Sequence, residues 1–114
     1  MPYESKIRPF NTDRVTKNTT ISQSILKDLK QIADLNEMPL NQLIAEGIDY
    51  VLQNYKKPSD FKSPDKPLDR VQMGTTFSES QYNMLKERAR KLHTHTNTLL
   101  ELGMKHVIQN HLKT

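Results

Sequence analysis

The chain contains an internal duplication, and no other feature constrains its fold as strongly. Residues 13–55 align with residues 69–111 without a gap, at a constant offset of 56. Sixteen of the 43 aligned positions are identical, and many others are conservative, such as Ile21 with Phe77. Ungapped similarity at this level is not expected by chance, so we interpret the chain as two copies of one unit. Both copies are therefore expected to adopt the same local structure.

The duplication divides the chain into four segments. We assign them as an N-terminal arm (1–12), copy one (13–55), a linker (56–68) and copy two (69–114). The linker contains three prolines and alternating charges, a composition that predicts an extended connection rather than a helix or strand.

Each copy has the pattern of a strand followed by two helices. Apolar and β-branched residues first alternate with polar ones, which predicts a half-buried strand. Ser22 and Ser78 then occupy N-cap positions, and Ser78 with Gln81 has the spacing of a capping box. Two stretches of helical periodicity follow, separated by breaks at 36–39 and 93–95. The residues expected in the core are Ile25, Leu26, Leu29, Ile32, Ala33, Leu40, Leu43, Ile44, Ile48, Val51, Leu52 and Tyr55 in copy one, and Tyr82, Leu85, Ala89, Leu92, Leu99, Leu100, Met104, Val107 and Ile108 in copy two.

A single copy is too small to fold by itself. About 43 residues bury too little surface for independent stability, and apolar residues make up only 34% of the chain. A lone strand would also leave both of its edges unpaired. Two copies remove both problems if their strands pair antiparallel into a ribbon and their four helices pack beneath it.

This arrangement resembles the ribbon-helix-helix superfamily of DNA-binding proteins, to which the Arc and MetJ repressors belong. The resemblance is carried by the strand end Thr20-Ile21-Ser22 and by Met38–Ile44, which opens the second helix of copy one. It covers both copies but neither the arm nor the linker. It implies a mainly α fold with a two-stranded antiparallel ribbon, in a tandem βαα-βαα form that is similar to accessory proteins of plasmid conjugation.

The partner of each copy is expected to lie in the same chain. Superfamily members usually pair two identical chains, but here the second copy is covalently attached, so an intramolecular pseudo-dimer is the simplest arrangement. The sequence leaves open a pairing of copy one with copy one of another chain. Gly47 and Gly103 occupy matched positions within the second helices, which indicates close helix contact near a pseudo-twofold axis.

Strand alternation separates an inner face from an outer one. Val15, Thr19 and Ile21 share a face, as do Val71, Met73, Thr75 and Phe77, so these side chains should point towards the helices. The charge of Lys17 is out of place on this face, and its stem can extend to water. A two-stranded ribbon fits the DNA major groove, where Asn and Gln pair with adenine and Thr contacts several bases. The resemblance therefore implies that the outer residues read bases: Thr16, Asn18, Thr20, Gln72, Gly74 and Thr76. Gly74 contributes no side chain there.

A second set of positions is expected to contact phosphates. The resemblance places the N-terminus of each second helix near the DNA backbone, where free N–H groups and the helix dipole hold an anion. The matching residues are Leu40 and Asn41 in copy one and Thr96 and Asn97 in copy two. Arg14 and Arg70 at the ribbon ends complete this set. Lys6, Arg8 and Phe10 of the arm are accessory candidates, although a disordered tail is the favoured interpretation.

Charge is distributed unevenly between the copies. The net charge of +4 permits nucleic-acid binding without requiring it. Copy one contains four basic and six acidic residues, whereas the aligned part of copy two, residues 69–111, contains six basic and four acidic ones. We therefore expect modest non-specific DNA affinity, with specificity provided by the ribbon.

Other functional classes find little support in the sequence. The chain lacks Cys, and the histidines at 93 and 95 are interpreted as turn residues, so neither a metal site nor a cofactor is expected. The capping serines have no Asp/His arrangement for nucleophilic catalysis, and we expect no enzyme. No apolar run approaches the ~18 residues of a membrane span, and the N-terminus lacks the apolar core of a signal peptide. A cytoplasmic protein without a membrane partner is expected.

The leading hypothesis is a transcriptional repressor that inserts its ribbon into the major groove of a short, imperfect palindrome. Higher-order assembly on DNA is compatible with it. Two alternatives remain open: a relaxosome accessory or plasmid-maintenance protein that binds DNA, and a protein–protein adaptor that has lost DNA binding. An antitoxin is less favoured, because the last helix is expected to run almost to Thr114.

Overall fold

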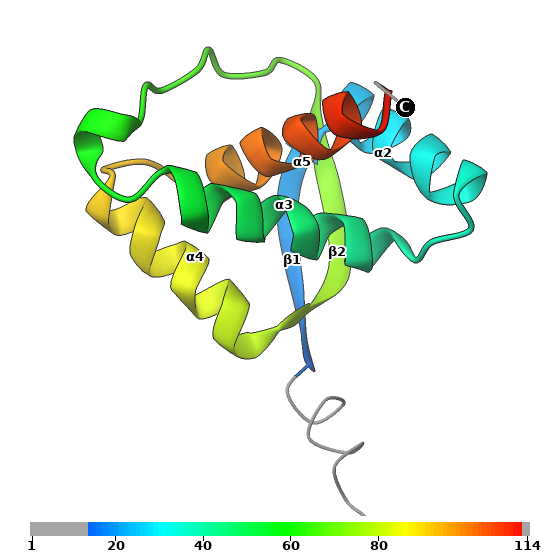
Figure 1. The fold of residues 1–114 in the computed structure, drawn as a ribbon, viewed down its shortest axis with the longest axis horizontal. Coiled ribbons are helices and arrows are strands. Elements are labelled where there is room, and N and C mark those ends of the chain that lie inside the picture. Colours follow the sequence, from blue (N-terminus) through cyan, green and yellow to red (C-terminus); the bar gives the residue numbers. More distant parts are fainter. Residues whose placement is uncertain (1–13, 113–114) are drawn as a thin grey trace, which may run out of the picture.

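The computed structural model describes residues 14–112, which form a mainly helical fold with a two-stranded antiparallel sheet (Figure 1). The N-terminal arm and its candidate residues Lys6, Arg8 and Phe10 lie outside the described residues. The elements follow the order strand, helix, helix, twice along the chain, which is compatible with a ribbon-helix-helix-like arrangement.

The sheet pairs the strand of copy one with the strand of copy two. Strand β1 (Arg14–Ser22) runs antiparallel to β2 (Arg70–Ser78), in a register that places Asn18 opposite Gly74. These two residues are also matched by the offset of 56, so the register is symmetric about them. This is the register expected if a pseudo-twofold axis passes through the centre of the ribbon.

Each strand continues directly into a helix through a serine cap. Ser22 Oγ accepts a hydrogen bond from the N–H of Ile25 at the start of α2 (Gln23–Leu35). Ser78 Oγ accepts one from the N–H of Gln81 at the start of α4 (Glu79–Lys91). The capping assignments are confirmed for the serines. The side-chain amide of Gln81, however, donates to the carbonyl of Ala45 and to Asp49 on a neighbouring helix.

The turns that connect the helices are matched as well. Helix α2 ends before Glu37, and α4 ends before His93, both of which adopt a positive φ, of 53° and 59°. The next residue, Met38 or Thr94, donates its N–H back to the carbonyl of Ala33 or Ala89, which closes the helix end. The chain then enters α3 (Leu40–Asn54) and α5 (Thr96–Leu112).

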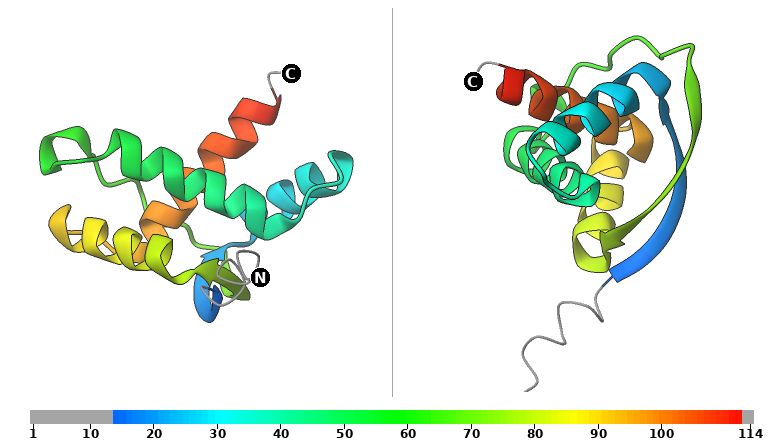
Figure 2. Two further views of the ribbon diagram at one scale, coloured as in Figure 1. Left: turned by 60° about the horizontal axis from the view of Figure 1, so that its bottom comes forward. Right: turned by 90° about the vertical axis from the view of Figure 1, so that its right-hand side faces the viewer.

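All four helices lie on one face of the ribbon, so its other face is open (Figure 2, right). Helices α3 and α5 cross beneath the strands at Gly47 and Gly103. A Cβ atom on Gly47 would lie 2.7 Å from the carbonyl carbon of Gly103, so only glycines allow the two backbones to approach this closely. The close approach expected from their matched positions is confirmed.

One core occupies the space between the ribbon and the helices. It contains the predicted stripes of both copies, with Leu29, Leu43, Leu85 and Leu99 fully buried. Leu40, Leu52, Tyr55, Tyr82 and Ile108 are only partly buried and pack at its edge. No helix among residues 14–112 is both long and apolar enough to cross a membrane.

The linker forms no helix or strand apart from one short turn. Residues Pro58–Asp60 form a single 3-10 turn, where an extended connection was expected. The reason is local: Asp60 accepts hydrogen bonds from the N–H groups of Lys56 and Lys57, and Pro58 starts the turn with a suitable φ. Phe61 then packs edge-on against Tyr55, which attaches this part of the linker to the core.

Candidate nucleic-acid interface

The open face of the ribbon carries the six positions that are expected to read bases. Thr16, Asn18, Thr20, Gln72 and Gly74 are exposed, whereas Thr76 is half-buried. Ile21, Met73 and Phe77 on the inner face are buried, so the strand parity deduced from alternation is confirmed. Lys17, on the inner face, extends to 5.6 Å from the centre of the Tyr82 ring, which gives its charge a cation–π contact.

Asn18 is the only side chain at the centre of this face, because Gly74 lies opposite it on β2. A Cβ on Gly74 would lie 2.7 Å from Asn18 Oδ1, so the amide of Asn18 occupies the space above Gly74. The centre of the ribbon therefore presents one amide rather than the symmetric pair that two identical strands would give.

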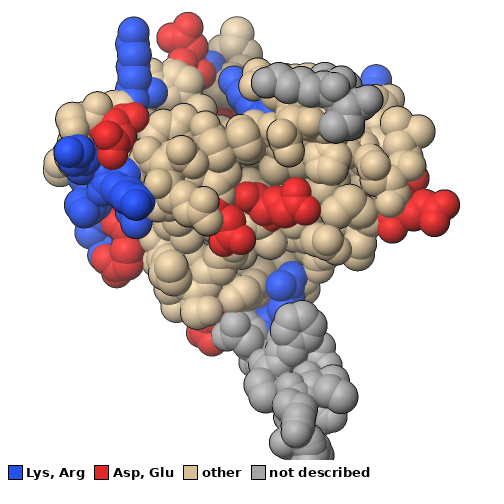
Figure 3. Space-filling model, viewed as in Figure 1, with Lys and Arg blue, Asp and Glu red and all other residues tan. Residues whose placement is uncertain are grey.

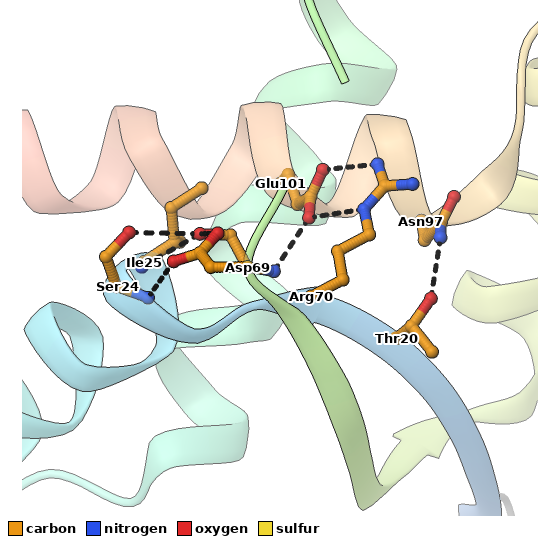
Figure 4. Close-up of polar contacts among 8 residues, drawn as sticks. Thr20, Ser24, Ile25, Asp69, Arg70, Asn97 and Glu101 are labelled. Atoms are coloured by element: carbon orange, nitrogen blue, oxygen red, sulfur yellow. Dashed lines mark hydrogen bonds and ion pairs between the residues drawn. The ribbon is translucent and has the colours of Figure 1, made fainter. Parts of the chain in front are cut away.

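The helix N-termini are joined to the ends of the ribbon by two equivalent hydrogen bonds. Asn97 Nδ2 at the start of α5 donates to Thr20 Oγ1 at 3.0 Å (Figure 4), and Asn41 Nδ2 at the start of α3 donates to Thr76 Oγ1 at 3.2 Å. The expected phosphate positions, Leu40, Asn41, Thr96 and Asn97, thus lie beside the expected base-reading positions. The N–H groups of a first helical turn have no partner within the helix, so they are suited to an anion.

The two matched arginines differ in their surroundings. Arg70 makes a bidentate ion pair with Glu101 of α5, with distances of 3.0 Å from Nε to Oε2 and 2.7 Å from the second nitrogen to Oε1 (Figure 4). Glu101 Oε2 also accepts the N–H of Ser22 at 2.8 Å. Hydrogen bonds to Glu101 raise the pKa of Arg70 above its ordinary value. The structure thus gives Arg70 an internal partner, and a phosphate is not needed to explain its position.

Arg14 instead lies across the outer face at the opposite end of the ribbon. It donates to the carbonyl oxygen and the hydroxyl of Thr76, at 2.8 and 2.9 Å. The alignment explains the difference, because Ala45 stands on α3 where α5 has Glu101. Arg14 therefore remains at the surface beside the ribbon, as a phosphate contact requires, but it also covers Thr76.

Two surface hollows flank the ribbon. One, of about 680 Å³, lies between the linker and the start of α5, and Thr20, Lys66, His95 and Asn97 are among its lining residues. The other, of about 470 Å³, lies between α2 and β2 and is lined in part by Lys27, Lys30 and Gln72. These lysines were not singled out from the sequence, because only the packing of α2 against β2 brings them beside the ribbon.

Asp69, just before β2, joins the two copies at one ribbon end. Its carboxylate accepts the N–H of Ser24 at 3.0 Å and the hydroxyl of Ser22 at 2.8 Å (Figure 4). Hydrogen bonds from Ser24 and then Ser22 hold the pKa of Asp69 below its ordinary value of 3.8. Because the folded state favours the charged form, this stabilisation is present above pH 3.8 and is lost as the pH falls further.

We predict that Asp69→Asn lowers the melting temperature at neutral pH but not in strong acid. The wild-type protein loses the contribution of this carboxylate when it is protonated, so the two melting temperatures should converge as the pH falls below 3.8. Thermal unfolding followed by circular dichroism across this range tests the prediction. The control is Asp28→Asn, on the exposed face of α2. A difference between wild type and Asp69→Asn that persists unchanged in acid would contradict the assignment.

Within residues 14–112, no group of three or more His, Asp or Glu side chains is arranged to hold a metal ion. No protein-family model matches the chain, and no curated protein or solved structure matches it either.

Proposed function

We propose that this chain is a tandem ribbon-helix-helix protein that binds double-stranded DNA sequence-specifically, as a transcriptional repressor with its ribbon in the major groove. The observation that carries the proposal is the open ribbon face, where exposed Thr and amide side chains lie between two helix N-termini. Such side chains are suited to base edges, and helix N-termini are suited to the flanking phosphates.

The contacts between the copies support a DNA-binding ribbon whose two strands come from one chain. Arg88 of α4 donates to the carbonyls of Leu52 and Tyr55 at the end of α3, at 2.9 and 2.7 Å. The position that matches Arg88 in copy one is Ile32, which cannot donate. A ribbon formed by two first copies would therefore lose these bonds. It would equally lose the bonds of Gln81, whose matched residue is Ile25, and the ion pair of Arg70 with Glu101.

The asymmetry of the reading face has a consequence for the DNA site. One strand presents Thr16, Asn18 and Thr20, whereas the other presents Gln72, Gly74 and a Thr76 that is covered by Arg14. The half-sites are therefore expected to differ in sequence, with the adenine-compatible amides of Asn18 and Gln72 providing most of the discrimination.

In-vitro selection from a random duplex pool tests the proposal. We expect enrichment of one short, imperfectly palindromic site. Asn18→Ala should then weaken binding to it by about 10- to 100-fold, as expected for loss of a bidentate base contact worth ~1–3 kcal/mol. Because Asn18 is exposed, its replacement should leave the melting temperature almost unchanged.

The matched control is Gln53→Ala, which removes an exposed amide from α3 rather than from the ribbon. It should bind the selected site as wild type does. Unchanged affinity of a triple variant, Thr16→Ala/Asn18→Ala/Thr20→Ala, would refute the ribbon mechanism. A selection that enriches no sequence would favour a protein–protein adaptor instead.

A further inference from the structure

The two ends of the molecule carry opposite charge. Helices α2 and α4 end at opposite extremes of the long axis, at the right and left of Figure 1. Asp34 and Glu37 are exposed where α2 ends, and Arg90 and Lys91 are exposed where α4 ends. In Figure 3 acidic side chains protrude at the right-hand edge, and basic ones gather at the left with acidic ones beside them. We call Asp34, Leu35 and Glu37 the acidic end, and Met84, Arg90 and Lys91 the basic end.

One pair of these charges occupies matched positions of the duplication. Asp34 aligns with Arg90, so this position carries opposite charge in the two copies, whereas Glu37 aligns with His93 and Lys91 with Leu35. Cations near a helix C-terminus interact favourably with the helix dipole, which accounts for the basic residues that end α4. Asp34 and Glu37 oppose the dipole of α2, whose last turn contains no basic residue. Local helix stability therefore does not explain the acidic end.

Each end also exposes an apolar side chain. Leu35 is 83% exposed between the two carboxylates. Met84 is 54% exposed and lines a hollow of about 420 Å³ together with Arg88 and Lys91. An apolar side chain flanked by anions thus faces one direction. At the other end of the molecule lies a hollow in which Met84 is accompanied by two cations and one anion, Glu87.

We propose that the acidic end of one molecule binds the basic end of a second copy of this chain. Such a contact joins different surfaces, so it does not close on itself and generates a linear array. Arg90 forms an exposed ion pair with Glu87 at 3.1 Å, and a pair of this kind exchanges easily for a partner's carboxylate.

The direction of the array fits the proposed function, on which this part of the inference rests. Strands that lie in the major groove cross the duplex axis steeply, and the line between the two ends runs across the strands (Figure 1). The array would therefore follow the duplex, with neighbouring sites about one molecular length, 51 Å, apart.

The contact is tested first without DNA, by sedimentation velocity of the full chain. At about 10 mM salt, where charges act over roughly 30 Å, we expect concentration-dependent association that disappears at about 1 M. Asp34→Lys/Glu37→Lys and Arg90→Glu/Lys91→Glu should each weaken association at least about tenfold, because like charges then meet. The quadruple variant, whose net charge equals that of wild type, should associate again.

Two further variants separate a specific contact from general charge effects. Glu46→Lys/Asp49→Lys makes the same change in net charge at exposed positions in the middle of α3 and should associate as wild type does. Leu35→Ser leaves the charge unchanged and should weaken association while preserving the melting temperature. A wild-type chain that stays monomeric in low salt, or end variants that associate as well as wild type, would overturn the proposal.

Binding to a selected duplex then separates the two proposals. The end variants should keep their single-site affinity but lose cooperativity on two adjacent sites. Absence of single-site binding by wild type would refute the proposed function and leave the association result standing, whereas equal cooperativity in wild type and end variants would refute the contact alone.

Discussion

Gly103→Ala is expected to lower the free energy of unfolding by about 3 kcal/mol, although alanine normally stabilises a helix by ~1 kcal/mol relative to glycine. The new methyl group would meet the carbonyl oxygen of Gly47 and lie 2.6 Å from its carbonyl carbon. Backbone atoms cannot rotate away, so α3 and α5 must separate. The core between them, including Leu43 and Leu99, would then lose contact. Chemical denaturation provides the measurement.

The reciprocal variant and the pair make the prediction specific. Gly47→Ala should cost a similar amount, since its methyl group would lie 2.7 Å from the carbonyl carbon of Gly103. The double variant should cost less than the sum, because the first methyl group already forces the helices apart. Gln42→Ala, at an exposed helical position, should leave stability almost unchanged. Additive or stabilising effects at the glycines would mean that the helices do not cross there.

Much of the fold follows from the duplication together with simple periodicity. The offset of 56 matches Asn18 with Gly74, and the ribbon register is symmetric about that pair. Strand alternation separates exposed Thr16 and Thr20 from buried Ile21, because the side-chain period of a strand is two. These features depend on local patterns that both copies repeat, so one sequence is enough to predict them.

The polar contacts between the copies were harder to predict because they depend on packing. Glu101 interrupts an apolar helix and differs from its matched residue, Ala45, while the arginines at 14 and 70 are identical. This mismatch indicates that the two arginines have different partners. The sequence does not show, however, that Arg70 and Glu101 lie close together. The turn in the linker could not be predicted for a similar reason. Three prolines indicate an extended segment, and the sequence does not show that Asp60 can cap a turn.

Glu101→Ala is expected to destabilise the protein by about 3 kcal/mol, the lower part of the range for breaking a buried ion pair. The carboxylate is almost fully buried, and its loss leaves both the Arg70 guanidinium and the Ser22 N–H without their acceptor. The exposed fraction of the Arg70 side chain, 15%, lets water offset part of this cost. Glu101→Gln should be milder because its amide oxygen still accepts the Ser22 N–H. Urea denaturation ranks the variants.

A double variant separates the effect of the unpaired charge from that of the lost carboxylate. Arg70→Leu/Glu101→Leu should be more stable than Glu101→Ala, since it leaves no unpaired charge and fills the space with apolar atoms, while the Ser22 N–H lacks its acceptor in both. Ala45→Glu gives the comparison at the opposite ribbon end, where it should draw Arg14 away from Thr76 and uncover that hydroxyl. The half-site read by β2 should then change in a repeated selection, whereas the half-site read by β1 should not. If Glu101→Ala were as stable as wild type, the Arg70 guanidinium would have to lie in water rather than in a buried ion pair.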